Sequence, residues 1–226
     1  PKKKLSFSEN FFHMCFGKVP SKEIVRAFDV SLMLYAEHSF NVSTFTARTI
    51  TSSLSDIHGA ITGAIASLKG PLHGGANEEV MHMMNKIKKP EKAFKWINKA
   101  LDNKDVVMGF GHRVYKKGDS RVPTMEKFFK NVSKINNDKK YAKIYDIDKE
   151  VMIKRKNIYP NVDYPTGPTY HLMGFDTDFF TPIFVISRIT GWSAHIMEQH
   201  AANKLIRPLA SYKGNKHRKV LQLNQR

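Results

Sequence analysis

Apolar residues recur at helical spacing along most of the chain. The clearest case follows Ser21, a residue type that caps helix N-termini well. Its apolar face consists of residues three or four positions apart: Ile24, Phe28, Leu32 and Tyr35. The same periodicity predicts helices over residues 76–89, 94–101, 123–155 and 167–173, and a long last helix that ends near residue 205. No stretch alternates as a strand would and no repeat is visible, so the pattern predicts an all-α fold.

Small residues dominate the stretch 43–68. Its glycines, alanines and serines include Ala47, Ser52, Ser53, Gly59, Ala60, Gly63, Ala64 and Ala66. Such a composition is typical of a helix whose backbone approaches another helix closely, because small side chains leave room for it. We expect one long helix here, packed either against a second subunit or inside its own subunit.

Length and composition fit a globular protein with one core, or a core with a small appended lobe. Of the 226 residues, 41% are hydrophobic and 25% are charged. No apolar run approaches the ~18–20 residues that span a bilayer, and the first residues lack the apolar region of a signal peptide. The single cysteine, Cys15, permits no internal disulfide and is expected to be a buried, inert thiol in a reducing compartment.

The formal charge of +17 favours polyanionic partners. Lysines crowd the stretches 86–104 and 116–156. One interpretation is a basic nucleic-acid-binding protein, because basic surfaces attract phosphate backbones. No recognised nucleic-acid module or interleaved aromatic platform accompanies the lysines. A phosphate-bearing small molecule such as coenzyme A is the second interpretation, and a lysine-rich solvated surface is the third.

One segment carries a specific chemical signal. His73 stands directly before Gly74-Gly75, at the start of the helix predicted over residues 76–89. Glycines let a ligand approach the backbone, and the positive end of a helix disfavours a second positive charge on the imidazole. A neutral imidazole can polarise a carbonyl group. The alternative is a glycine-rich loop that carries an ordinary surface histidine.

Several further motifs follow one another along the chain in an order that can be compared with known families. Tyr35-Ala36-Glu37-His38 precedes the His73 segment, residues 107–115 and Asp119-Ser120-Arg121 follow it, and residues 161–167 and 187–208 complete the series. In this order, from about Phe12 to the end, the chain resembles the citrate synthases, above all their 2-methylcitrate synthase branch. It departs from the family at Ser39, where a glutamate is common, and at Ser120, where proline often stands.

The resemblance implies a citrate synthase-like architecture of two helical domains. The large domain would comprise residues 1–72 and 164–226, and the small domain, residues 73–163, would close over the active site. The family pattern begins before this chain does, and the chain starts with proline, so we expect an N-terminally truncated piece of the large domain. The resemblance also implies a homodimer whose core includes the small-residue helix, and no membrane association. Its implied compartment is the cytoplasm, or the mitochondrial matrix in a eukaryote.

The implied reaction joins propionyl- or acetyl-coenzyme A to oxaloacetate with hydrolysis of the thioester. It yields 2-methylcitrate or citrate, products of propionate catabolism or of the tricarboxylic acid cycle. Asp163 would remove the α-proton, His73 would stabilise the enolate, and His112 would polarise the ketone. Acyl-coenzyme A is a co-substrate, and the resemblance implies no permanently bound cofactor.

The substrate contacts are also carried over from the family. His38, Arg121, Arg188 and, from the neighbouring subunit, Arg207 would bind oxaloacetate. Coenzyme A would lie along a segment with its basic neighbour: Val107, Met108, Gly109, Phe110, Gly111 and Arg113. The residues themselves agree at two points. Apolar neighbours of Asp163 favour a raised pKa, and Arg188 stands in an apolar stretch where a bound dianion would give it a partner. Metal hydrolysis by His38, His73 and His112 is a weaker alternative, because their spacing lacks the i,i+4 pattern of a helical metal site.

Overall fold

The computed structural model describes residues 1–215 and 219–226. Within these residues the chain forms ten α-helices and two short 3₁₀ helices, with no strand, so the all-α prediction is confirmed. The elements are α1 (Phe7–Phe16), α2 (Lys22–Tyr35), α3 (Val42–Ser52), α4 (Ile57–Leu68), α5 (Ala76–Ile87), α6 (Pro90–Asp102), α7 (Val122–Ile135), α8 (Lys140–Lys156), α9 (Asp163–Leu172), η1 (Thr177–Phe179), α10 (Phe180–Ala201) and η2 (Leu223–Gln225).

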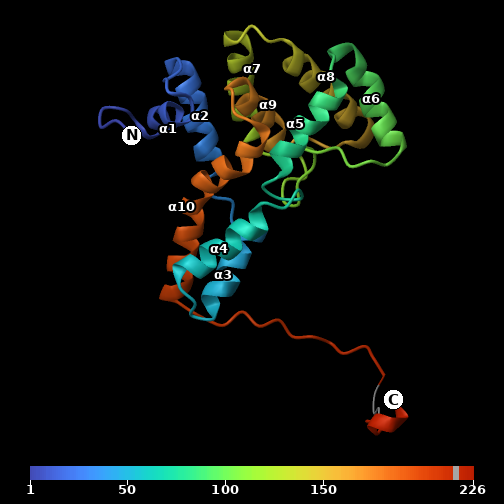
Figure 1. The fold of residues 1–226 in the computed structure, drawn as a ribbon. Helices are drawn as coiled ribbons and strands as arrows, with labels where there is room; N and C mark the ends of the chain where they lie inside the picture. Colours follow the sequence, from blue (N-terminus) through green and yellow to red (C-terminus); the bar gives the residue numbers. More distant parts are fainter. Residues whose placement is uncertain (216–218) are drawn as a thin grey trace.

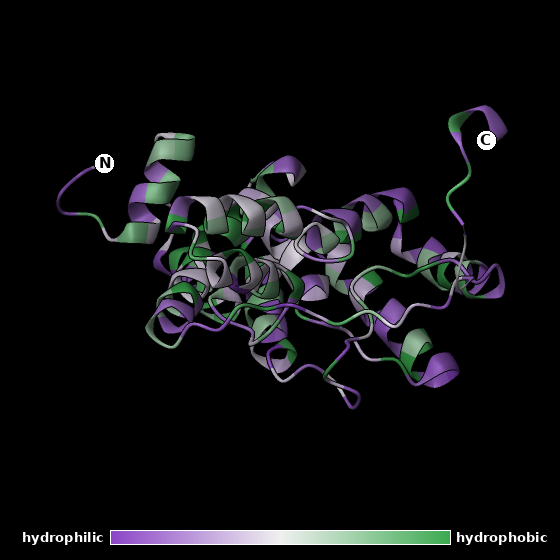
Figure 2. Ribbon diagram, turned by 90° about the horizontal axis from the view of Figure 1, so that it is seen from below, coloured by the Kyte–Doolittle hydropathy of each residue, from purple (hydrophilic) through white to green (hydrophobic). Residues whose placement is uncertain are grey.

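Most of the helices surround α9. In Figure 1, α1 and α2 lie on one side of this helix and α5, α6 and α8 on the other, while α7 packs against both α9 and α2. Their buried apolar side chains form one continuous core that also takes in the first turns of α10. Figure 2 shows apolar segments gathered toward the middle of this body and hydrophilic ones toward its edges. None of the described helices has both the length and the apolar character needed to cross a membrane.

The small-residue stretch is two helices rather than the one we expected. Leu54 adopts a left-handed φ of 66°, and the Asp56 side chain then caps α4 by accepting from the Gly59 amide at 2.8 Å. The helices α3 and α4 pack against each other and against the C-terminal half of α10 (Figure 1). A Cβ on Gly63 would strike the Ile50 side chain of α3. The close backbone approach that these small residues permit is therefore made inside the chain.

Other helix boundaries also differ from the expected ones, and α6 begins at Pro90 instead of residue 94. The stretch 123–155 is broken between α7 and α8, where Asn137 has a φ of 51°. The last helix ends at Ala201, short of residue 205. Helix α9 begins at Asp163 instead of residue 167, although Pro165 lies in its first turn. First-turn amides have no partner inside a helix, so a proline there costs little.

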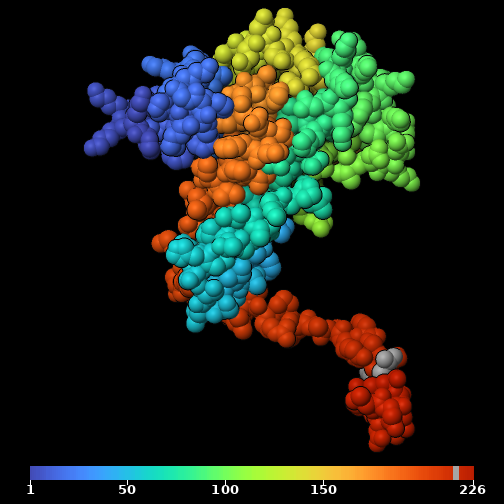
Figure 3. Space-filling view, viewed as in Figure 1, coloured from blue at the N-terminus to red at the C-terminus, as the bar shows by residue number. Residues whose placement is uncertain are grey.

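The two chain ends also differ from expectation. Cys15 is exposed rather than buried: the buried residues of α1 are Ser8, Phe11 and Phe12, and Cys15 lies beyond them in the last turn. The basic and polar composition of the segment after Pro208 predicts a tail that wraps around a surface, but its described residues do not lie against the body. Figures 1 and 3 show it leading away from α10, and its described residues are exposed. The segment has no apolar periodicity with which to dock on a surface.

Candidate active site

Two histidines distant in sequence meet at one point. His38 lies in the loop between α2 and α3, and His112 lies between α6 and α7. Their Nε2 atoms are 3.0 Å apart, and the Tyr115 ring packs against both. The His112 Nδ1 atom accepts from the amides of Val114 and Tyr115 at 3.0 and 3.2 Å. Its proton therefore resides on Nε2, where it is donated to the Nε2 atom of His38.

His73 is oriented by two residues that sequence reasoning missed. Its Nε2 atom accepts from the Ser43 amide at 3.3 Å and lies 2.8 Å from the Ser43 hydroxyl. Trp192 of α10 donates its indole N–H to that hydroxyl at 3.1 Å. Because Nε2 accepts from an amide, the proton of a neutral His73 ring lies on Nδ1, which has no acceptor among the described residues. Ser43 lies two positions after Asn41, the N-cap of α3. This position in the sequence does not indicate that Ser43 binds His73.

All three imidazoles are held neutral. Burial lowers the pKa of His38 and of His73 to about 4 each, and nearby Arg188 reinforces both shifts. Burial also lowers the pKa of His112. The neutral state that we predicted for His73 therefore has a different main cause: desolvation and a neighbouring cation act on it, in addition to any effect of the α5 N-terminus.

Arg188 is a buried cation with an unused donor. Its side chain is 1% exposed, its Nε donates to the Tyr35 carbonyl at 2.7 Å, and its guanidinium lies 4.8 Å from the centre of the Phe184 ring. Its Nη1 atom is buried and has no partner among the described residues. Burial lowers its pKa to about 10, so the group stays charged at neutral pH. A buried, partly unpaired cation is costly, and this one is suited to an anionic ligand.

Arg121 already has a carboxylate partner, which sequence reasoning did not assign. Its Nε and Nη2 donate to the two oxygens of Asp119 at 3.0 and 2.7 Å. Asp119 also accepts from the backbone amide of Val162 at 3.1 Å. This carboxylate therefore ties Arg121 to the residue directly before Asp163. The position of Asp119, two residues before Arg121, is the sequence feature that could have indicated this pairing.

Asp163 lies in the first turn of α9, and its carboxylate is partly covered by the surrounding protein. Tyr35 donates to its Oδ1 at 2.5 Å, a contact between residues 128 positions apart. Burial raises the pKa of Asp163 to about 6, although the Tyr35 hydrogen bond and the charges of Arg121 and Arg188 act in the opposite direction. The carboxyl group is thus ionised at neutral pH but basic enough to take a proton.

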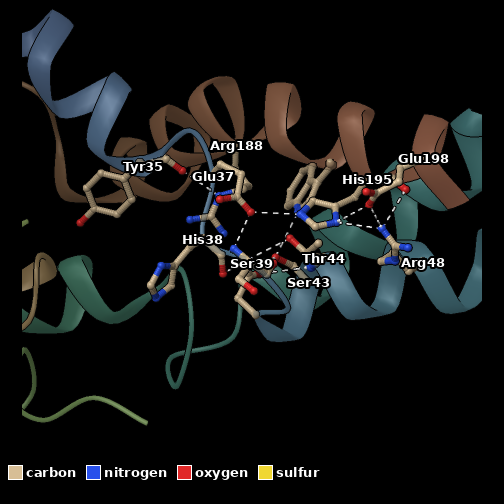
Figure 4. A network of polar contacts seen from close by, with 12 residues as sticks. Tyr35, Glu37, His38, Ser39, Ser43, Thr44, Arg48, Arg188, His195 and Glu198 are labelled. Carbon is tan, nitrogen blue, oxygen red and sulfur yellow. Dashed lines mark hydrogen bonds and ion pairs between the residues drawn. The ribbon is translucent and has the colours of Figure 1, made fainter. Parts of the chain in front are cut away.

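One aromatic ring joins the parts of this site. Phe184 of α10 contacts the Tyr35 ring at 4.3 Å and the His73 ring at 6.1 Å, with Arg188 over its face. Figure 4 shows Tyr35 at the end of α2, His38 in the loop that follows and Arg188 of α10 as neighbours in this region. The structure therefore brings six predicted residues into one region: His38, His73, His112, Arg121, Asp163 and Arg188.

The candidate coenzyme A segment runs beside the site. Gly109 and Gly111 have φ values of 82° and 80°, and a Cβ on Gly109 would lie 2.7 Å from atoms of Tyr164 and Val80. Phe110 forms an isolated antiparallel bridge with Pro160, and the Asn161 amide donates to the Gly109 carbonyl at 2.9 Å. These bonds attach residues 107–111 to the chain just before Asp163.

Two predicted arginines are exposed at the surface instead of joining this group. Arg113 is exposed, and Arg207 lies exposed in the segment after α10, where it donates to the Pro208 carbonyl. The glycines after His73 serve packing: a Cβ on Gly74 would lie 2.6 Å from the Leu68 carbonyl oxygen. Among the described residues, no three histidine, cysteine or acidic side chains are grouped as a metal ion would require.

Comparison with known proteins identifies the family. The family described as "Citrate synthase, C-terminal domain" matches residues 1–209. The chain is 56% identical to 2-methylcitrate synthase 2 of Corynebacterium glutamicum over 231 residues, covering 100% of this chain and 60% of that protein. It is 54% identical to a citrate synthase of Mycolicibacterium smegmatis over 221 residues, covering 98% of this chain and 59% of that protein. The chain belongs to the citrate synthase family.

A solved structure agrees with this assignment. The Thermoplasma acidophilum citrate synthase, in ternary complex with carboxymethyl coenzyme A and oxaloacetate, superposes with a TM-score of 0.88 at 39% identity. The match covers 100% of this chain and 61% of that one. The chain thus spans about 60% of the length of the relatives it matches.

Proposed function

We propose that this chain carries the catalytic groups of an enzyme that condenses a short acyl-coenzyme A with oxaloacetate and hydrolyses the thioester. The observation that carries this proposal is the arrangement around Arg188. A buried guanidinium with a free donor lies beside neutral histidines and a carboxylate with a raised pKa. This combination suits a dianionic keto acid and a carbon acid that must lose a proton.

Oxaloacetate would bind first through its carboxylates. Arg188 offers its free Nη1. The Nη1 of Arg121 makes only a long hydrogen bond of 3.5 Å to the Leu34 carbonyl, so it can also donate to a carboxylate. His38 would add a further contact. The Nε2–H of His112, which faces His38 in this structure, would then exchange that partner for the ketone oxygen, and this makes the carbonyl carbon more electrophilic. Arg207 of a second subunit would complete the site, as the family resemblance implies.

Asp163 would remove the α-proton of the acyl group. Its pKa of about 6 lets it be ionised at neutral pH, and the hydrogen bond from Tyr35 orients the carboxylate. The Nδ1–H of His73 would donate to the thioester oxygen as negative charge develops there. The enol carbon then attacks the ketone carbon, the ketone oxygen takes up a proton, and water cleaves the thioester to release coenzyme A.

A hollow beside residues 107–110 suits the nucleotide end of coenzyme A. Its volume is about 390 Å³, and its lining includes Lys104, Val107, Phe110, Lys156 and Ile158. Apolar side chains can cover an adenine ring, while the two lysines can meet phosphates. Both lysines are exposed, so their charges are accessible. Arg113 would add a further positive charge nearby.

The remaining proposals concern assembly and substrate choice. We propose a homodimer, with residues 73–163 closing over oxaloacetate held by residues 1–72 and 164–226. Propionyl-coenzyme A is the proposed acyl donor, because the sequence most resembles the 2-methylcitrate synthase branch. The pathway would be propionate catabolism, and the compartment would be the cytoplasm, or the mitochondrial matrix of a eukaryote. The comparisons give no support to the nucleic-acid-binding alternative.

A thiol-release assay tests this function on the protein as it is naturally produced. With oxaloacetate present, propionyl-coenzyme A should release free thiol faster than acetyl-coenzyme A at equal concentration, and omission of oxaloacetate should stop the reaction. Discrimination of one methylene in an apolar pocket is worth only about 1–3 kcal/mol, so both thioesters should react. Preference for the acetyl thioester would reverse the choice of donor, and no oxaloacetate-dependent release from either would overturn the proposed function.

A further inference from the structure

A group of polar side chains begins at Glu37, beside His38 and Arg188, and runs away from them along α10. It joins Glu37 to His195 and Arg48, and it ends at Glu198 (Figure 4). The side chains of His195 and Arg48 are 14% and 13% exposed, so most of their surface is covered by protein. None of these four residues has a part in the reaction described above.

The Glu37 carboxylate closes the turn that carries His38. Its Oε1 atom accepts a hydrogen bond from the Ser39 amide, on the far side of His38 in the sequence. Ser39 has a φ of 49°, in the left-handed region that a residue with a side chain seldom adopts. The strained turn therefore depends on a contact that holds it closed, and the carboxylate beside His38 supplies this contact.

His195 of α10 fixes that carboxylate from outside the turn. Its Nε2 lies 3.0 Å from Glu37 Oε1, while Arg48 donates from Nη1 to its Nδ1 at 3.0 Å. An imidazole nitrogen that accepts from a guanidinium carries no proton, so the neutral ring holds its proton on Nε2 and donates it to Glu37. Arg48 is in turn held by Glu198 at 2.6 Å.

Two further contacts attach the same loop to α10 and α3. Gly191 of α10 lies so close that an added Cβ would strike the Ala36 carbonyl oxygen and come within 3.3 Å of Glu37 Cα. On the other side, the Arg48 guanidinium lies 5.1 Å from the centre of the Phe40 ring, which also packs against His195. The loop is thus held at both ends, and His38 lies between them.

We propose that His195, oriented by Arg48, is a positioning residue that holds Glu37 and thereby presents His38 to oxaloacetate. This inference rests on the proposed role of His38 in substrate binding. His195 itself does not touch the substrate. Its donated proton fixes the Glu37 carboxylate, the carboxylate fixes the Ser39 amide, and the turn between them sets the direction of the His38 ring.

Two substitutions of His195 separate positioning from general stability. The amide nitrogen of glutamine reaches the place of Nε2, so His195→Gln keeps a donor for Glu37. Asparagine is shorter and reaches only the place of Nδ1, so His195→Asn loses that donor. We expect His195→Asn to raise the oxaloacetate KM about tenfold with little change in kcat or acyl-coenzyme A KM, and His195→Gln to stay within about threefold of wild type.

A control and a second readout complete the test. Lys130→Gln removes an ion pair with Asp146 far from this loop and should change neither KM. Hydrogen exchange at the Ser39 amide, measured by NMR, should accelerate in His195→Asn and stay slow in His195→Gln. Equal oxaloacetate KM values for the two His195 variants, or a uniform loss of activity and Tm in both, would overturn the inference.

The exchange readout also separates this inference from the proposed function. If the wild type shows no oxaloacetate-dependent thiol release, the proposed function fails, while faster exchange in His195→Asn alone still supports the restraint on the turn. If condensation is present but Ser39 exchange is the same in all variants, the function stands and the positioning role is wrong.

Discussion

Two carboxyl groups that each accept a hydrogen bond from a tyrosine differ in what else surrounds them: Asp148 is fully buried, and Asp163 is half-buried. Tyr35 donates to Asp163 at 2.5 Å, and Tyr164, the next residue after Asp163, donates to Asp148 at 3.0 Å. Burial raises the pKa of Asp163 to about 6 and that of Asp148 to about 7. By burial, tyrosine partner and pKa alone, either residue qualifies as a general base.

The cations separate the two. Arg121 and Arg188 act on Asp163 and keep it ionised at neutral pH. Among the residues that the structure describes, no such cation acts on Asp148 and its Oδ1 has no partner. The Tyr145 and Tyr164 rings, which stack on each other beside it, belong to the main core. A perturbed carboxyl group is thus a candidate for catalysis only where other polar groups converge on the same space.

Substitution of each aspartate in turn gives the largest expected contrast. Asp163→Asn should lower kcat by about a hundred- to ten-thousandfold, because an amide of similar shape cannot take the α-proton. Asp148→Asn should stay within a few-fold of wild type. Thiol release under saturating substrates measures both. Wild-type turnover in a folded Asp163→Asn variant would remove the base assignment.

The second largest effect is expected from removal of a cation near Asp163, which should weaken substrate binding. Arg188→Ala should raise the oxaloacetate KM by about ten- to a hundredfold, since a hydrogen bond to a charged group contributes about 1.5–3 kcal/mol. Arg26→Ala, at an exposed position on α2, is the matched control and should leave KM unchanged. An unaltered KM in folded Arg188→Ala would instead make Arg188 a structural residue.

The two tyrosines should differ in the pH profile. Asp163 must be ionised to act, so kcat/KM should fall below about pH 6, while His38 and His73, with pKa values of about 4, stay neutral across that range. The Tyr35 hydrogen bond lowers the pKa of Asp163, so Tyr35→Phe should move the acid limb to higher pH. Tyr164→Phe should leave its midpoint in place. A limb that both variants shift equally would point to another titrating group.

The smallest effect concerns stability. The folded-state pKa of Asp148 lies above its ordinary value near 3.9, so the native state binds more protons in between, and the free energy of unfolding falls as pH rises toward 7. Asp148→Asn should reduce this fall by about 1–3 kcal/mol between pH 4 and pH 8. Urea unfolding of wild type and variant at both pH values measures the difference. Parallel curves would show that Asp148 does not titrate in this range.

Local sequence was enough for much of the helical framework. Ser21 caps α2 through a bond from the Ile24 amide, as its position before an apolar period predicted, and α5 starts at Ala76 as expected. Such features depend on residues a few positions apart. At Leu54 and Asn137, residues with a left-handed backbone separate two helices. The apolar periodicity continues across these residues, so it predicted one helix where the structure has two.

The candidate catalytic and binding residues could also be identified from the sequence, because the order of the motifs and the spacing of the glycines can be read directly from it. What only the tertiary structure decided is how these residues are made reactive. The Tyr35–Asp163 bond spans 128 positions, and the Trp192–Ser43 bond that helps to orient His73 spans 149. Desolvation, tautomer and the free donor of Arg188 all depend on what packs around a group, and side chains distant in sequence supply that packing.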